Sequence, residues 1–150
     1  MQLPIQSAPE YSAELPVSKK TVKFRPFLVK EQRNMLMVTE DSSTTEMYHA
    51  LVSMLQSVLI TDTQVDELPM TDVEFLFIQV RAKSIGETQE VDMKCVNTED
   101  CDGKVKMKLD LNDIIISKTD VPQDGRIELN EELTVELAVP SSKSMMTVVD

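Results

Sequence analysis

The stretch from Leu68 to Glu87 constrains the fold most, because it has the pattern of a complete helix that is apolar on most of its surface. Four apolar residues recur at helical spacing and form one face: Val73, Leu76, Phe77 and Val80. Phe75 and Ile78 lie outside that face, so the helix presents apolar side chains in several directions. We therefore expect it to be buried on more than one side and to be the central helix of the fold.

Both ends of this helix carry stop and start signals. Thr71 and Glu74 have the spacing of a capping box, in which each side chain bonds the other residue's backbone N–H. Arg81 and Lys83 place positive charge at the negative end of the helix dipole. Gly86 allows the positive φ that ends many helices. The sequence thus predicts a helix over about residues 71–84.

Two further helices are predicted before it. Residues 30–40 are rich in good helix formers. Ser43 and Glu46 form a second capping box, and it opens a helix over about residues 44–60 with one apolar face. We expect this face to pack against the central helix.

After Gly86 the apolar period changes from 3.6 residues to 2, which is typical of strands with one buried face. Asp102-Gly103 and Asp124-Gly125 are strong turn signals. Together with an N-terminal segment of the same pattern, this predicts five strands, over about residues 20–25, 88–95, 104–111, 126–129 and 133–139.

The predicted fold class is therefore α+β. An N-terminal strand and three helices pack on a small, mostly antiparallel β-sheet with one buried and one charged face. Residues 1–18 hold three prolines and no periodicity, and we expect a flexible N-terminal arm. Residues 19–140 form a single domain, and residues 141–150 a C-terminal tail.

The chain is strongly acidic, with 26 Asp and Glu against 15 Lys and Arg and a net charge of −11. Such a surface repels nucleic acid and anionic membranes, and it favours solubility or a basic protein partner. No apolar run approaches the ~20 residues of a membrane helix, and the start lacks a signal-peptide pattern. With only two cysteines, a reducing cytoplasmic setting is the default expectation.

The sequence offers little chemistry. Its three glycines form no phosphate-binding loop, and its single histidine, His49, excludes a two-histidine metal site. We expect His49 to be a surface residue. The carboxylates are spread along exposed strand faces, and no nucleophile motif is present. We expect no catalysis and no cofactor.

Cys95 and Cys101 are the weak exception, since five residues separate them across a predicted hairpin loop. Three interpretations remain open: free thiols, half of a zinc site completed by carboxylates or a second chain, and a disulfide. Two thiolates alone do not make a structural zinc site, so no metal site is assigned.

Two basic groups stand out as candidate partner-binding patches in an acidic chain. The first surrounds the predicted N-terminal strand and consists of Lys23, Arg25, Phe27 and Lys30. It fits a docking edge for an acidic or extended segment, or simply a solvated strand face. The second is Arg81 and Lys83, which fit either docking or compensation of the helix dipole.

Two runs, Val22–Glu31 and Asp72–Glu87, followed by Cys95 and Cys101, resemble the baseplate hub assembly proteins of T-even-type tailed bacteriophages. The resemblance extends from about residue 20 to residue 140. Longer members of that family continue past the last strand, so we expect a short member or a truncated product.

The resemblance implies a non-catalytic, chaperone-like role in building the central hub. The implied partners are other hub or spike proteins, in the host cytoplasm during assembly and then, for a retained protein, in the tail baseplate. Two alternatives stay open. One is a structural hub subunit, with a homo-oligomer around the tail axis as one form, and the other is a small metal-binding protein built on Cys95 and Cys101.

Overall fold

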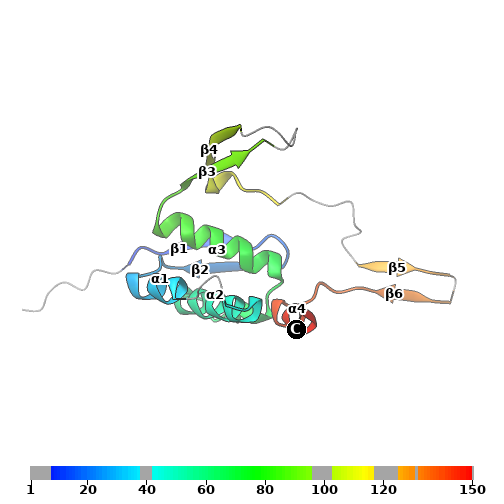
Figure 1. The fold of residues 1–150 in the computed structure, drawn as a ribbon. Coiled ribbons are helices and arrows are strands. Elements are labelled where there is room, and N and C mark those ends of the chain that lie inside the picture. The colour runs from blue at the N-terminus through cyan, green and yellow to red at the C-terminus, as the bar shows by residue number, and fades with distance from the viewer. Residues whose placement is uncertain (1–7, 38–41, 96–102, 117–124, 131, 150) are drawn as a thin grey trace, which may run out of the picture.

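The computed structural model describes residues 8–37, 42–95, 103–116, 125–130 and 132–149, and within them the chain has an α+β fold (Figure 1). The N-terminal part contains β1 (Tyr11–Glu14), β2 (Thr21–Phe24), α1 (Val29–Leu36), α2 (Thr44–Val58), the 3₁₀ helix η1 (Val65–Glu67) and α3 (Met70–Ser84). The C-terminal part contains β3 (Thr88–Lys94), β4 (Lys104–Asp110), η2 (Leu111–Asp113), β5 (Arg126–Glu128), β6 (Thr134–Glu136) and α4 (Ser142–Val149).

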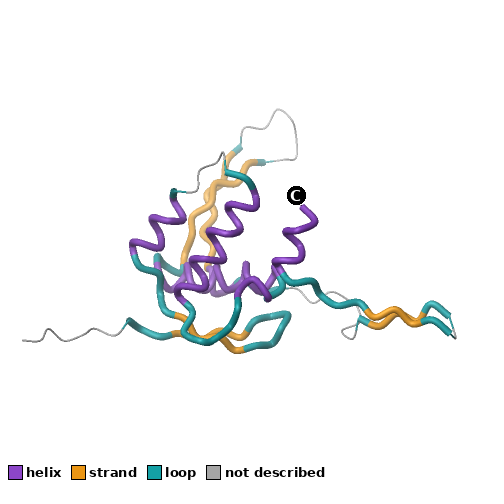
Figure 2. Tube along the Cα trace, turned by 90° about the horizontal axis from the view of Figure 1, so that it is seen from below, coloured by secondary structure: helices purple, strands orange, loops and turns teal. Residues whose placement is uncertain are grey.

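The core lies between α2, α3 and the antiparallel β1–β2 hairpin, and in Figure 2 the helices all lie to one side of that hairpin. On α3 only Thr71 and Glu74 are exposed within residues 70–84, which confirms that the central helix is buried on more than one side. The buried cluster comprises Leu15, Val22, Phe24, Met54, Leu55, Val58, Val65, Leu68, Val73, Leu76 and Val80.

The start of α2 matches its predicted capping box. The Glu46 N–H donates to Ser43 Oγ at 3.2 Å, and the Ser43 N–H donates to Glu46 Oε2 at 2.9 Å. The start of α3 differs from the prediction, because the helix begins at Met70 with Pro69 as its cap. The Pro69 carbonyl accepts the first helical bonds, so the capping box expected at Thr71 does not form.

The predicted arm over residues 1–18 differs from the structure where it is described, and residues 1–7 of that prediction lie outside the described residues. Residues 11–14 form β1 and pair with β2, and Leu15 is fully buried. The carboxylate of Asp72 on α3 accepts backbone N–H bonds from Val17 at 2.8 Å and Ser18 at 2.9 Å. Sequence periodicity missed this because the ordering comes from a carboxylate more than fifty residues away in the chain.

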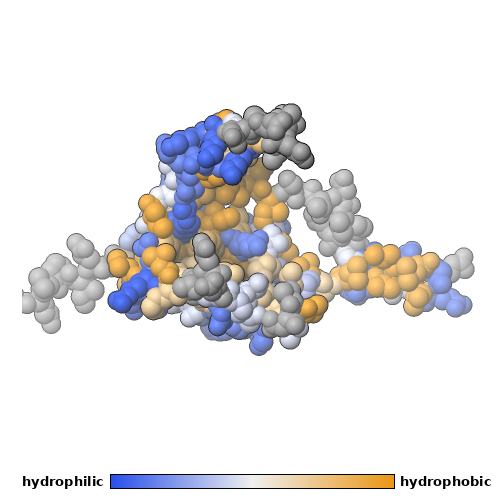
Figure 3. Space-filling model, in the orientation of Figure 1, coloured by the Kyte–Doolittle hydropathy of each residue, from blue (hydrophilic) through white to orange (hydrophobic). Residues whose placement is uncertain are grey.

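The second half does not form the single sheet that was predicted. The strands of the described residues pair only as three separate antiparallel hairpins, β1–β2, β3–β4 and β5–β6. The β5–β6 hairpin projects from the helical part in Figure 1, and Figure 3 shows apolar residues along it. The alternating pattern was correct in each strand, but the expected buried face is exposed in both C-terminal hairpins.

The predicted C-terminal tail is a helix in the structure. Ser142 at the start of α4 is fully buried, its N–H donates to the Leu68 carbonyl at 2.7 Å, and its hydroxyl lies 2.9 Å from Tyr48 Oη. Met146 is buried one turn later. These contacts tie the start of α4 to α2 and to the residue pair before α3.

Candidate functional site: an apolar pocket between the helices

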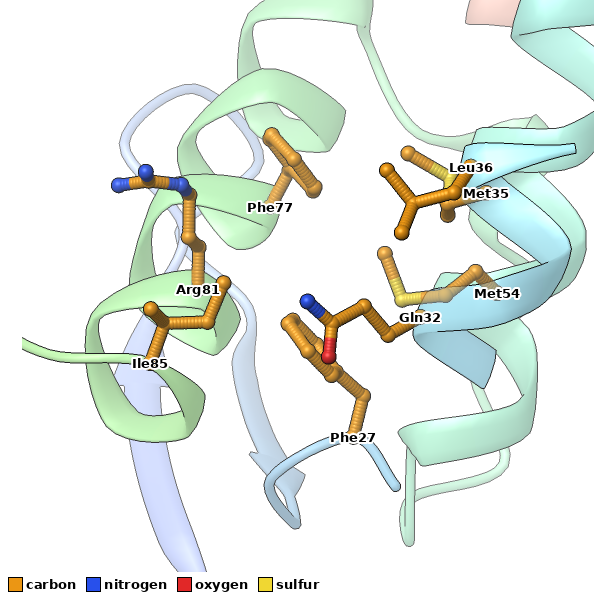
Figure 4. A pocket seen from close by; sticks show the side chains of 8 residues that line it. All are labelled: Phe27, Gln32, Met35, Leu36, Met54, Phe77, Arg81 and Ile85. Carbon is orange, nitrogen blue, oxygen red and sulfur yellow. The ribbon is translucent and has the colours of Figure 1, made fainter. Parts of the chain in front are cut away.

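An open pocket of about 160 Å³ lies between α1, α2, α3 and the segment that joins β2 to α1 (Figure 4). Its walls are mainly apolar, and only Gln32 and Arg81 bring polar groups. The lining residues are Phe27, Gln32, Met35, Leu36, Met54, Phe77, Arg81 and Ile85. A pocket of this composition suits an apolar side chain better than a charged metabolite.

One wall of the pocket is formed by residues at helical spacing on α3. Phe77, Arg81 and Ile85 follow each other at intervals of four residues, so they share one side of α3. In Figure 4 the guanidinium of Arg81 points away from the cavity while the stem lines it. The guanidinium donates to Gln89 Oε1 at the start of β3, which holds it outward.

Phe27 reaches the pocket because its backbone is tied to α3. The Phe27 N–H donates to Ser84 Oγ at 3.0 Å, and the Ser84 hydroxyl donates in turn to the Val80 carbonyl. This chain of bonds fixes the segment before α1 against the last turn of α3. The aromatic wall is therefore preorganised.

Arg25 and Glu31 lie outside the pocket lining but hold α1, which carries part of that lining, against α2. Arg25 Nη2 lies 2.9 Å from Glu31 Oε1 and also donates to the Ser57 carbonyl at 3.0 Å, so it joins the residue after β2 to α1 and α2. Glu31 is buried and accepts the Leu28 N–H as well, which caps α1. The Arg25 hydrogen bond lowers the pKa of Glu31, against the opposing effect of burial.

The predicted partner-binding residues separate into three environments. Phe27 from the first patch and Arg81 from the second line the same pocket. Lys23 and Lys30 are exposed, on β2 and α1 respectively. Arg25 forms hydrogen bonds within the fold, and its part in docking stays a prediction. A substitution of Arg25 would change the stability of the protein as well as any effect on binding.

Lys83 completes the second patch but lies outside the pocket lining. It forms an ion pair with Glu87, and its ammonium lies 5.8 Å from the centre of the Tyr11 ring. The Glu87 hydrogen bond raises the pKa of Lys83, and the same bond lowers the pKa of Glu87. Both groups are solvated, so this pair contributes little to stability.

Sequence reasoning missed most of the pocket lining. The spacing of Phe77, Arg81 and Ile85 was a usable signal, since intervals of four residues place the three side chains on one side of a helix. Met35, Leu36 and Met54 gave no such signal, because only the packing of α1 and α2 brings them to the cavity.

The sequence of the chain matches one known protein family. A family model described as "T4 bacteriophage base plate protein" matches residues 8–149. The chain belongs to this family. Searches of curated proteins and of solved structures found no match.

This base plate protein has no metal-binding cluster of three His, Cys, Asp or Glu among the described residues. Cys95 is exposed, and its backbone N–H donates to the Gly103 carbonyl at 2.9 Å, so Cys95 and Gly103 lie together. Cys101 lies outside the described residues, and the pairing or metal use of the two cysteines stays a prediction. His49 is exposed, as expected.

Within the part of the base plate protein that the structure describes, no helix has the length and apolar character needed to span a bilayer. Membership of the family associates the chain with other phage baseplate proteins and with the virion tail.

Proposed function

We propose that this base plate protein is a non-catalytic assembly factor of the baseplate hub, and that it holds an apolar segment of a hub or spike protein in the α1–α3 pocket. The observation that carries the proposal is the open apolar pocket with exposed apolar residues at its rim. Leu36 is 75% exposed and Ile85 is 58% exposed. Side chains this apolar and this exposed around a cavity mark an interaction site.

An open pocket with this apolar lining can accept an apolar anchor from a helix or an extended segment. Met35 and Met54 can adjust to different anchors, because methionine is unbranched and polarizable. The Arg25–Glu31 and Phe27–Ser84 contacts keep the walls in place before binding. Preorganised walls lower the ordering cost of association.

The test is co-purification of tagged protein with the baseplate proteins of phage-infected cells, identified by mass. Leu36→Glu places a charge at the pocket rim, and Asn34→Glu places the same charge on an exposed position of the same helix. We expect Leu36→Glu to lose hub or spike proteins from the eluate and Asn34→Glu to retain them, with equal thermal midpoints. Equal recovery by both variants contradicts pocket docking.

The basic patch has its own test. Lys30→Glu and Lys23→Glu reverse two exposed charges that make no ion pair among the described residues. If this patch steers an acidic partner, each variant slows association, and the loss grows at low ionic strength. Association rates that do not change assign these lysines to the solvated surface.

The alternative function is a structural hub subunit that stays in the particle. The exposed apolar faces of the two C-terminal hairpins favour it, because a permanent site would cover them. Mass spectrometry of purified virions separates the two functions. An assembly factor works in the host cytoplasm and is absent from virions, whereas a subunit is present in stoichiometric amount.

A further inference from the structure

The two C-terminal hairpins share an unusual feature, which is one apolar face open to solvent. On β3–β4 the residues of this face are 37–64% exposed, and they are Val91, Met93, Val105, Met107 and Leu109. On β5–β6 the corresponding residues are 44–59% exposed, and they are Ile127, Leu129, Leu133 and Leu137. The opposite faces carry charged side chains.

Among the described residues, no element buries the apolar face of either hairpin. Each is a two-stranded sheet, and an isolated two-stranded hairpin is at best marginally stable in water. Each apolar face exposes on the order of 400 Å², a size at which apolar patches on soluble proteins mark interaction sites. The two faces are similar in size and therefore match each other.

Charge selects which faces meet. Strands β3 and β4 carry four lysines against three acidic residues, so this hairpin is net positive in a chain of charge −11. Strands β5 and β6 carry two glutamates and one arginine, and Glu132 adds a third carboxylate in their turn. These side chains lie on the faces away from the contact, so it is the net charge of each hairpin that acts: two β5–β6 hairpins repel each other, whereas unlike hairpins attract.

We propose that a second copy of this chain covers these faces, with β5–β6 of each copy packed on β3–β4 of the other. Each contact alone buries roughly 800 Å², which is small for a stable complex, but the two contacts of a symmetric pair bury roughly 1,600 Å², the usual size of a specific interface. A two-fold axis produces both contacts at once.

The whole-molecule charge does not prevent this pairing. The Debye length at physiological ionic strength is about 8 Å, so distant charges are screened and the charges next to the contact dominate. A hairpin only two strands wide, about 5 Å between strands, lets lysine side chains such as Lys106 reach around its edge toward the opposite glutamates.

The pairing is tested with the purified full chain by sedimentation equilibrium over a concentration series, where the monomer mass is 16.9 kDa. The test does not involve any baseplate partner, so it stands whether or not the proposed assembly role holds. We expect concentration-dependent dimerisation with twice the monomer mass. A monomer at every concentration up to about 100 µM overturns the proposal.

Variants then locate the contact. Leu137→Gln and Val105→Gln each place a polar group on one apolar face, and each should weaken the dimer at least tenfold. Ala138→Gln and Thr88→Gln place the same side chain at exposed positions on the opposite faces of the same two hairpins. These controls should change the dissociation constant less than about twofold, because they leave the contact intact.

Mixing the two variants gives the decisive result. A mixed pair of Leu137→Gln and Val105→Gln keeps one unmodified contact, because the intact β3–β4 of the first meets the intact β5–β6 of the second. We expect the equimolar mixture to dimerise more tightly than either variant alone. A mixture that dimerises no more tightly than the single variants overturns reciprocal pairing.

A different result would be a wild-type protein that is monomeric and a Leu137→Gln variant with a lower thermal midpoint. This result would overturn the proposal, because it shows that the hairpin is covered within one chain.

Discussion

Replacement of Glu31 by Gln tests how the fold holds the pocket together. Glu31 is buried, receives Arg25 Nη2 at 2.9 Å and accepts the Leu28 N–H at the start of α1. Glutamine keeps the shape but removes the charge, which leaves the Arg25 guanidinium with the carbonyls of Pro26 and Ser57.

Breaking a fully buried ion pair costs about 3–5 kcal/mol. The Arg25 side chain is 25% exposed, so water partly compensates its charge. The three hydrogen bonds to the carboxylate, from Arg25 Nη1, Arg25 Nη2 and the Leu28 N–H, are charge-assisted, and a neutral amide replaces them only in part. We therefore expect Glu31→Gln to lower the free energy of unfolding by roughly 1–3 kcal/mol at neutral pH.

The pH dependence follows from the direction of the pKa shift. The folded pKa of Glu31 is below its ordinary value of 4.5, so its charge stabilises the folded state above that pH. The contribution is lost as pH falls from about 4.5 through the folded pKa. The difference in stability between wild type and Glu31→Gln should thus be constant between pH 7 and 5.5 and shrink below pH 4.5.

Urea unfolding of both proteins across this pH range measures the effect. Glu74→Gln, at an exposed position on α3, is the matched control and should stay within about 0.5 kcal/mol of wild type. A Glu31→Gln variant as stable as the control at pH 7 would refute the argument. So would a stability difference that does not shrink in acid.

Two further substitutions and one metal analysis test other parts of the molecule. Asp72→Ala removes both acceptors of the Val17 and Ser18 N–H groups, so we expect a loss of roughly 2–3 kcal/mol in urea unfolding and faster amide exchange at both residues. Gly125→Ala places a Cβ 2.1 Å from the Leu137 carbonyl oxygen at a φ of +61°, and it should open the β5–β6 hairpin, seen as lost amide protection without loss of the core. Metal analysis should find less than about half an equivalent of zinc, whereas a full equivalent that Cys95→Ser removes would instead support the metal-binding alternative.

The helical part was predictable because its signals are local. The apolar positions of α3 fall on several sides of the helix, and the Ser43–Glu46 box depends on residues three apart. Local signals failed at the start of α3, where Asp72 holds the β1–β2 connection and Pro69 provides the cap. A carboxylate that could join a cap is indistinguishable in sequence from one that binds a distant backbone.

The candidate site was predicted only in fragments. Phe27 and Arg81 were assigned to two separate patches on charge and composition, and they line one pocket. Arg25 has the same sequence signature as an exposed basic residue, yet its guanidinium joins three elements. A basic residue is available to a partner only where the fold places no buried carboxylate beside it, as it places Glu31 beside Arg25.

The α+β class, the central helix and the two-residue alternation of β2 to β6 could be predicted from the sequence alone, because periodicity and capping act within a few residues. Tertiary structure alone decided that the strands form three separate hairpins, that residues 11–14 and 142–149 join the fold, and that α1, α2 and α3 enclose a pocket. These outcomes depend on contacts between residues tens of positions apart, whose free energy appears only when the chain is packed.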